Sequence, residues 1–186
     1  MRVLMLVAAM LAALITQGGV ARADEAAAWQ ALREGAIGLI RHARAPGTGD
    51  PEGFRLDDCA TQRNLSDEGR NQAKRLGEAI RAAGVTVAAA PHSLWCRTRE
   101  TAELAFPGVT RPEPALNSFF ADRSTEPEQT AAASRIIRDW RGPGALMLVT
   151  HQVNITALTD IVPKEGEIIV VRVEGDAIRV VGRLFP

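Results

Sequence analysis

Short apolar runs that alternate with stretches of helical spacing constrain the fold of this chain most. Three runs, at residues 36–40, 85–90 and 145–150, are almost wholly apolar and too short for buried helices, so they predict buried strands. Strands that alternate with helices favour a largely parallel sheet with helices packed on it. The pattern predicts an α/β fold: a three-layer sandwich with a mainly parallel central sheet flanked by helices, in a single compact domain.

The clearest helix lies between residues 66 and 84. Ser66 is a favourable N-cap, Asp67 and Glu68 place negative charge in the first turn, and Gly84 is a common residue at a helix end. The apolar residues between them fall on one face, as packing against a sheet requires. Further helices are expected at 25–33, at 94–106, after a loop within 116–140, and at 152–160. Two strands joined by a turn at 174–176 are expected at the end of the chain.

The first residues have the pattern of a secretory signal peptide. A basic residue precedes an apolar stretch that ends near Ile15, and Ala21-Arg22-Ala23 offers the small residues that signal peptidase recognises. The apolar stretch is shorter than the ~20 residues of a spanning helix, although an uncleaved anchor is the alternative. We expect a signal peptide at 1–23, a mature domain at 24–186, a periplasmic or secreted location, and no membrane span after signal removal.

The charge balance argues against a nucleic-acid partner. The chain carries 22 Lys and Arg against 22 Asp and Glu, and the part after residue 23 keeps 20 basic residues against 22 acidic ones. A nucleic-acid-binding surface needs a basic excess, which this composition does not supply, although local clusters of arginine remain. The sequence makes no prediction about oligomeric state.

The chain has two cysteines, Cys59 and Cys96. An even count in an exported protein favours a disulfide, which could add a few kcal/mol to stability. Two separate thiols are the alternative, because spacing in the sequence proves no geometry.

Two of the three histidines stand at predicted strand ends. His42, with Arg41 before it, follows the first strand, and His151 follows the strand at 145–150. The carboxyl ends of parallel strands meet at one edge of a sheet, so we expect the two histidines to share a crevice. Neutral imidazole can attack phosphorus, and arginine binds phosphoryl oxygens in pairs. Arg41 and Arg97 are the candidate cations.

Four segments, in order along the chain, resemble the motifs of the histidine phosphatase superfamily, the group with phosphoglycerate mutases and many acid phosphatases. They are Arg41-His42-Ala43, similar to its RHG signature; NLSDEGRNQA, similar to the helix start that follows; SLWCRTRETA, similar to its S-x-x-x-R-x-x-x-T-A stretch; and LVTHQVNIT, similar to its second histidine segment. Each motif alone is weak evidence for the resemblance, but the four occur in the superfamily's order and span almost the whole mature chain.

The resemblance implies a phosphomonoesterase that works through a phosphohistidine intermediate and needs no cofactor or metal. His42 would be the nucleophile, and Arg41, Arg97 and His151 would form the phosphate pocket around it. Asn64 would lie near the pocket, although its match is looser. The implied partner is a small-molecule or glycan-linked phosphate ester.

The superfamily's proton donor is a Glu or Asp, often between the second arginine and the second histidine. Asp122 fits this position best, and Glu126 is the runner-up. Two departures narrow the resemblance: Ala43 replaces the usual glycine, and Gln152 follows His151 where the phytase-like branch has Asp. Together with the short chain, they favour small exported histidine phosphatases similar to those proposed to act on lipopolysaccharide heptose phosphates.

Two other functions are weighed. A non-catalytic, exported anion-binding protein would need the arginines but not the histidines or a candidate acid, so catalysis is the better explanation. A zinc site made of His42, His92 and His151 would lack any short metal-ligand spacing. Substrate specificity is expected from the Gly- and Pro-rich loop at 45–63 and from the loop at 116–126.

Overall fold

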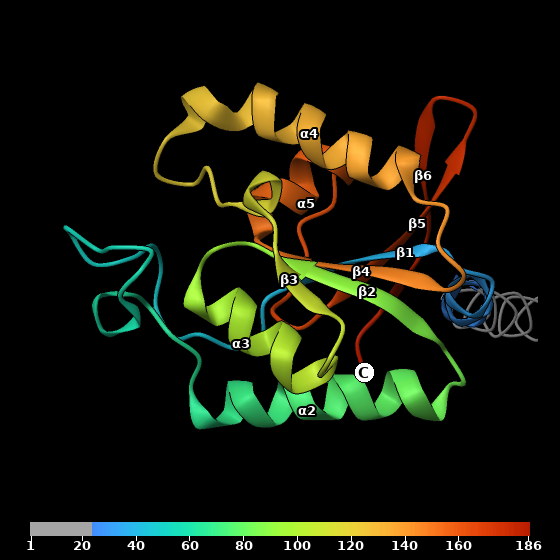
Figure 1. The fold of residues 1–186 in the computed structure, drawn as a ribbon, viewed down its shortest axis with the longest axis horizontal. Coiled ribbons are helices and arrows are strands. Elements are labelled where there is room, and N and C mark those ends of the chain that lie inside the picture. The colour runs from blue at the N-terminus through green and yellow to red at the C-terminus, as the bar shows by residue number, and fades with distance from the viewer. Residues whose placement is uncertain (1–23) are drawn as a thin grey trace, which may run out of the picture.

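A six-stranded sheet runs through the middle of the molecule (Figure 1). The structure, a computed structural model, describes residues 24–186, so the predicted signal peptide lies outside the described residues. In their order across the sheet, the strands are β3 (Thr110–Pro112), β2 (Val87–His92), β4 (Ala145–Thr150), β1 (Ile37–Arg41), β5 (Ile168–Glu174) and β6 (Ala177–Leu184). The three apolar runs of the sequence correspond to β1, β2 and β4.

Helices cover both faces of this sheet and complete the three predicted layers. On one face lie the helical residues 24–33 together with α2 (Asp67–Ala82) and α3 (Cys96–Ala105). On the other face lie α4 (Glu126–Asp139) and α5 (Gln152–Thr159). Within residues 24–186, no helix has both the length and the apolar character that crossing a membrane requires.

The prediction of a mainly parallel sheet is only partly right, because the sheet is mixed. β3, β2, β4 and β1 pair in parallel, whereas β5 runs antiparallel to both β1 and β6. After α5 the chain returns to the carboxyl end of β1, where the Arg41 amide donates to the Glu167 carbonyl at 3.2 Å. From that point β5 can only run back along β1, and the tight turn after it makes β6 antiparallel as well.

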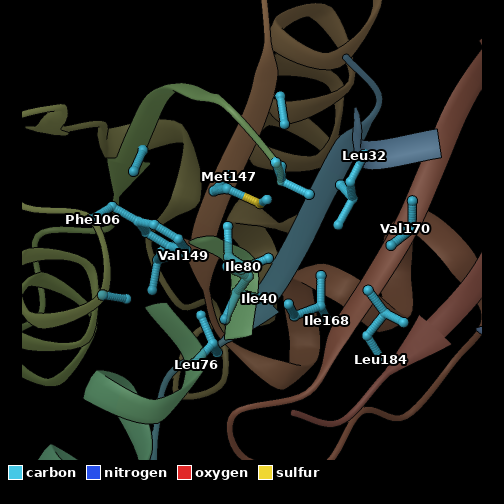
Figure 2. Packing of buried hydrophobic residues seen from close by; sticks show 14 of the residues in the cluster. Leu32, Ile40, Leu76, Ile80, Phe106, Met147, Val149, Ile168, Val170 and Leu184 are labelled. Carbon is cyan, nitrogen blue, oxygen red and sulfur yellow. The ribbon is translucent and has the colours of Figure 1, made fainter. Parts of the chain in front are cut away.

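Neighbouring residues of each central strand pack on opposite faces of the sheet. In β4, Met147 and Val149 join the cluster beneath α2, whereas Leu146 and Leu148 join the cluster beneath α4. Figure 2 shows the first cluster, in which Val149 lies near Phe106 and Ile80, and Ile168, Val170 and Leu184 of β5 and β6 extend the cluster on the other side of β1. Burial on both faces makes β1 and β4 a rigid support for the residues that follow them.

The loop after β1 is held against the start of α2. Ser66 caps the helix as predicted, because its hydroxyl accepts a hydrogen bond from the Gly69 amide at 3.1 Å, and its own amide donates to the Arg44 carbonyl at 3.1 Å. A Cβ at Gly69 would overlap that same carbonyl, so this helix position needs glycine. The close approach fixes the backbone just beyond His42.

Candidate active site

A cavity opens at the carboxyl edge of the sheet, where β1 and β4 end. It encloses about 420 Å³, and the loops at 47–54 and 118–121 form its outer walls. Its lining contains Arg41, His42, Arg97 and His151. Ligands of open α/β sheets bind at this edge, outside the carboxyl ends of the strands.

His42 and His151 meet because their strands are neighbours. β1 and β4 run parallel with Arg41 opposite Thr150, so the next residue of each strand leaves the sheet at the same point. The His42 amide donates to the Thr150 carbonyl at 3.0 Å, and the two imidazole ring centroids lie 5.6 Å apart. Both rings are buried, so the shared crevice expected from the sequence is present.

The surroundings of His42 leave one of its ring nitrogens with a free lone pair. Its Nδ1 lies 2.8 Å from the Ala43 carbonyl oxygen, which can only accept, so Nδ1 carries the proton. Burial, and then the positive charge of Arg97, hold the pKa of His42 well below the usual 6.5. The ring is therefore neutral near pH 7, with its lone pair on Nε2.

His151 is held by a chain of hydroxyl groups. The Thr98 hydroxyl donates to the Trp95 carbonyl at 2.8 Å, so Ser93 Oγ, 2.6 Å from Thr98 Oγ1, is the donor of that contact. Ser93 Oγ then accepts from His151 Nε2, which lies 2.7 Å away. This chain places the His151 proton on Nε2 and leaves Nδ1 as its free nitrogen. Burial, and then Arg97, also hold the pKa of His151 well below 6.5.

Three arginines surround the histidine pair. Arg41 and Arg97 were expected, and the structure adds Arg63, which lines the same cavity. Arg63 Nε donates to the Gly49 carbonyl at 2.7 Å, so Arg63 braces the wall loop as well. Sequence reasoning singled out Asn64, one residue away, and overlooked Arg63. A cation between a Gly-rich loop and a helix cap was the available signal.

Arg97, in the first turn of α3, is paired with Asp50 from the wall loop. Their side chains are 3% and 8% exposed, and Arg97 Nη1 and Nη2 lie 2.7 and 3.1 Å from the two carboxylate oxygens. Hydrogen bonds from Arg97, the Arg63 amide and the Trp95 indole, together with the charge of Arg97, lower the pKa of Asp50 despite its burial. Asp50 was not predicted as a site residue, because nothing in the loop sequence indicates its partner.

Two guanidinium N–H groups at this site have no partner within the described residues. They are the Nε atoms of Arg41 and Arg97, and both are buried. A buried, unsatisfied donor on a charged group costs free energy that an incoming acceptor can recover. The arrangement therefore suits an oxyanion with several acceptor oxygens.

Comparison with known proteins agrees with this geometry. Residues 37–118 match the family model of the histidine phosphatase superfamily (branch 1), a region that runs from β1 to the wall loop before α4. This part of the chain is therefore similar to the histidine phosphatase superfamily. No protein among the curated sequences matches it.

Solved structures with the same fold cover most of the chain at low sequence identity. The protein histidine phosphatase SixA complexed with tungstate matches with a TM-score of 0.56 and 13% identity, over 81% of this chain and 96% of SixA. Phosphoserine phosphatase from Entamoeba histolytica, as a mutant with phosphoserine, matches with 0.55 and 13%, over 79% and 95%. Phosphoglycerate mutase from Thermus thermophilus matches with 0.53 and 19%, over 80% and 97%.

The alanine that replaces the superfamily's glycine fits this backbone. Ala43 is fully buried, and its amide donates to Thr101 Oγ1 at 3.0 Å. Among the described residues only Asp160 has a positive φ without being glycine, so Ala43 keeps an ordinary backbone conformation. Alanine at this position therefore causes no backbone strain.

Asn64 lies outside the cavity lining and has a structural contact instead. Its side-chain amide donates to the carbonyl oxygens of Cys59 and Gln62 at 2.6 and 3.1 Å. Both bonds close the loop on itself just before α2. A role for Asn64 in phosphate binding stays a prediction, and the structure gives it no direct contact with the cavity.

The structure also leaves both predicted proton donors outside the lining. Asp122 accepts from the Ser124 amide and hydroxyl at 3.0 and 2.6 Å, and these bonds lower its pKa. Glu126 pairs with Arg123 at 2.8 Å. By contrast, Glu52 lines the cavity and has no hydrogen-bond or ion-pair partner among the described residues.

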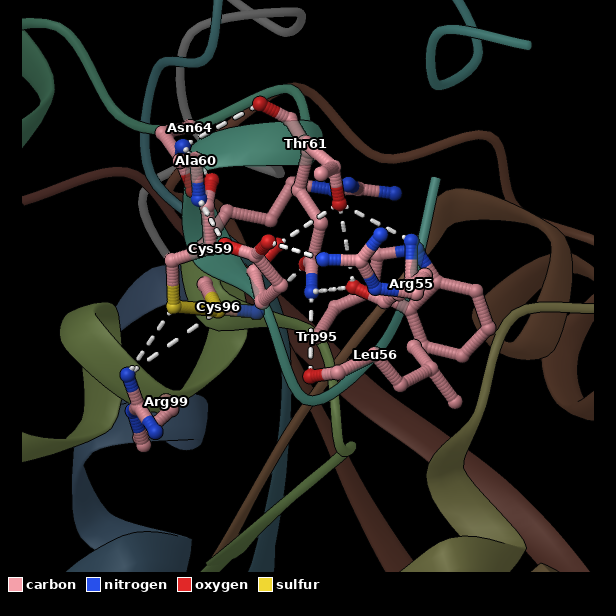
Figure 3. The surroundings of a disulfide bond; sticks show 12 residues. Arg55, Leu56, Cys59, Ala60, Thr61, Asn64, Trp95, Cys96 and Arg99 are labelled. Carbon is pink, nitrogen blue, oxygen red and sulfur yellow. Dashed lines mark hydrogen bonds and ion pairs between the residues drawn. A yellow bond between two sulfur atoms is a disulfide. The ribbon is translucent and has the colours of Figure 1, made fainter. Parts of the chain in front are cut away.

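The two cysteines form a disulfide with a Cα–Cα distance of 5.7 Å (Figure 3). Cys59 belongs to the wall loop, and Cys96 opens α3 directly before Arg97. In Figure 3 the bond lies between the loop and the helix, with Arg99 beside the sulfur atoms. The bridge therefore ties the loop that carries Asp50 to the helix that carries Arg97.

His92, the third histidine, does not join the pair. It is buried at the end of β2, its Nδ1 lies 2.8 Å from the Ser93 carbonyl, and it borders a different cavity with Arg99 and Arg111. Within residues 24–186 there is no group of three or more His, Cys, Asp or Glu residues placed to hold a metal ion. The zinc site considered from the sequence therefore has no ligand set in this part of the chain.

Proposed function

We propose that this protein is an exported, metal-independent phosphomonoesterase that works through a phosphohistidine on His42. The supporting observation is the pairing of a neutral imidazole, its Nε2 lone pair free, with three arginines at one cavity. A nucleophile needs that lone pair, and a phosphoryl group needs those cations. The SixA and phosphoserine phosphatase structures that share the fold are named for phosphatase activity, which supports the same chemistry.

In the first step, His42 Nε2 attacks phosphorus, the N–P bond forms and the bond to the leaving oxygen breaks. Arg41, Arg63 and Arg97 hold the phosphoryl oxygens while charge redistributes. His151 assists when protonated on Nδ1, because its Nε2 proton stays bonded to Ser93. A bound phosphoryl dianion favours that protonated form and offsets the neighbouring arginines.

An acid must give the leaving alcohol its proton, and the resulting carboxylate then takes a proton from the water that attacks phosphohistidine. Asp122 is the donor predicted from the sequence, with Glu126 as the alternative. Glu52 is the better-placed candidate, because it lines the cavity and has no partner among the described residues, whereas Asp122 is engaged with Ser124. We assign the acid role to Glu52.

The cavity wall supports a substrate with an apolar face next to its phosphate. Phe54, Trp95 and Phe120 line the cavity, and Phe120 is 52% exposed. Such a wall suits the apolar face of a sugar ring or a similar small alcohol. We therefore propose a small or glycan-linked phosphate ester, with lipopolysaccharide heptose phosphates as one member of that class.

Export rests on two observations. Residues 1–23 have the composition of a signal peptide, and the disulfide between Cys59 and Cys96 is typical of proteins in oxidising compartments. A periplasmic or secreted location would give the enzyme access to phosphorylated surface glycans. Fractionation of cells that express the full chain, with N-terminal sequencing of the product, tests cleavage after Ala23.

The deciding experiment is hydrolysis of 4-nitrophenyl phosphate by residues 24–186, with and without EDTA, beside His42→Ala. We expect chelator-resistant turnover that falls by at least about 10³-fold in the variant, since removal of a nucleophile removes the covalent route. Retention of wild-type turnover by His42→Ala would overturn the assignment. Phosphate binding without turnover on aryl or sugar phosphates would instead favour an anion-binding protein.

A further inference from the structure

The contacts of Arg97 leave one edge of its guanidinium group without a partner among the described residues. Nη1 and Nη2 each donate to one oxygen of Asp50, and Nη1 also donates to the Arg63 carbonyl at 3.3 Å. A guanidinium group has five N–H donors. The two left over are the Nε–H and the second Nη2–H, which point the same way and form a second fork.

This second fork is the part of Arg97 that an oxyanion can bind. Nε is buried and has no hydrogen-bond partner within the described residues. Two parallel N–H groups match two oxygens of a phosphoryl group as well as they match a carboxylate. Asp50 on one edge of the guanidinium is therefore compatible with a phosphoryl group on the other.

Asp50 is itself held in place from several directions. One carboxylate oxygen accepts from Arg97 and from the Arg63 amide at 3.1 Å, and the other accepts from Arg97 and from Trp95 Nε1 at 3.0 Å. Its side chain is only 8% exposed. A carboxylate with four donors and little solvent contact holds the flexible Arg97 side chain in one orientation.

We infer that Asp50 is a positioning residue, which holds Arg97 by one edge so that its other edge faces the transferred phosphoryl group. This inference rests on the proposed function, because it takes Arg97 as a phosphate ligand. A competing arrangement would have the opposite effect on phosphate affinity. In it, Asp50 would occupy Arg97 in place of phosphate and would have to leave when substrate arrives.

The test is competitive inhibition by inorganic phosphate in a double-mutant cycle of Asp50→Asn and Arg97→Gln, with 4-nitrophenyl phosphate as substrate. We expect Asp50→Asn to raise the Ki of phosphate about tenfold, since small displacements of a ligand group are costly. In the Arg97→Gln background, Asp50→Asn should change Ki by less than about twofold, because its effect passes through Arg97. Asp57→Asn, on the same loop but outside this cavity, is the control and should leave Ki unchanged.

Two results would overturn the positioning role. Tighter phosphate binding by Asp50→Asn would mean that Asp50 competes with phosphate, and an equal loss in both backgrounds would mean that it only stabilises the loop. If Arg97→Gln alone left Ki unchanged, the phosphate pocket of the proposed function would fail instead. Should Asp50→Asn not fold, Trp95→Phe removes one donor to Asp50 and should raise Ki by about twofold to threefold only when Arg97 is present.

Discussion

The two sides of the active site are built in different ways. His42 and His151 stand at the ends of buried parallel strands, and the register of β1 with β4 sets their relative position. The opposite wall, from Ala45 to Arg63, contains no α-helix or strand among the named elements and is held by a disulfide and by Asp50. The sheet thus places His42 and His151, whereas side-chain contacts place the loop residues that line the rest of the cavity.

That difference determines which parts of the site depend on a few polar contacts and which do not. The strand ends are supported by apolar clusters on both faces of the sheet, so their geometry does not depend on any one polar contact. The loop depends on a few contacts, among them the Gln62 side chain, which donates to two loop carbonyls and accepts from the Cys96 amide at 3.0 Å. Changes in the loop should therefore alter stability and specificity before they alter the histidine pair.

The largest effect expected on the loop side comes from removal of the disulfide. The bridge spans 37 residues, so its loss should lower the free energy of unfolding by about 4 kcal/mol on a chain-entropy basis. Urea unfolding of wild type and of Cys59→Ser/Cys96→Ser measures this. Reductant should destabilise the wild type but not the double variant. Equal stability of the two proteins would show that other contacts already fix the loop.

The next effect tests which carboxylate is the acid. Glu52→Gln should slow hydrolysis of an alkyl or sugar phosphate about 100-fold and that of 2,4-dinitrophenyl phosphate only slightly, because a good leaving group needs no proton. The measurement is kcat/KM against leaving-group pKa. Asp122→Asn is the matched control and should keep the wild-type slope. If Asp122→Asn changed the slope and Glu52→Gln did not, Asp122 would be the acid. His42→Ala would remain inactive in either case.

Low pH should lower the stability of the protein through His42 and His151, the two buried histidines at the ends of β1 and β4. Burial, and then Arg97, hold the pKa of His42 and of His151 well below 6.5 in the folded protein. Below about pH 6.5 the unfolded chain therefore binds protons that the native state does not, and the free energy of unfolding falls as pH decreases, by up to about 1.4 kcal/mol per pH unit for each histidine. Urea unfolding between about pH 7.5 and about pH 5 measures the slope.

A histidine variant checks the cause of that slope. His151→Gln should flatten it, because one of the two proton-binding differences is gone. Asp50, whose pKa is lowered from 3.8, contributes stability that is lost only as pH falls below that value, so it does not contribute within this window. Unchanged stability from about pH 7.5 to about pH 5 would contradict the depressed histidine pKa values.

The smallest expected effect concerns the arginine that the sequence analysis overlooked. Arg63→Gln should raise the Ki of inorganic phosphate about fivefold, because it removes one cation from the cavity lining but leaves Arg41 and Arg97. Arg70→Gln is the control, since Arg70 pairs with Glu100 at 2.8 Å and does not line the cavity. An unchanged Ki in Arg63→Gln would make Arg63 a brace of the loop and no phosphate ligand.

Much of the fold and the centre of the site could be predicted from the sequence. Continuous apolar runs indicated the buried strands, and strand ends in such a sheet share an edge, so the meeting of His42 and His151 followed from local pattern alone. The capped helix at 66–84 was equally evident, because caps and apolar spacing are local signals. These features depend on residues close together in sequence.

Long-range contacts set the direction of β5, the pairing of Asp50 with Arg97, the place of Arg63 and the surroundings of Asp122. Each depends on where a loop returns in space, and a loop without periodicity carries no signal of its long-range partners. Composition made the disulfide a reasonable expectation, but only folding brought Cys59 and Cys96 within bonding distance. Local sequence thus determined the position of His42 at the end of its strand, and long-range contacts of the loop determined what surrounds it.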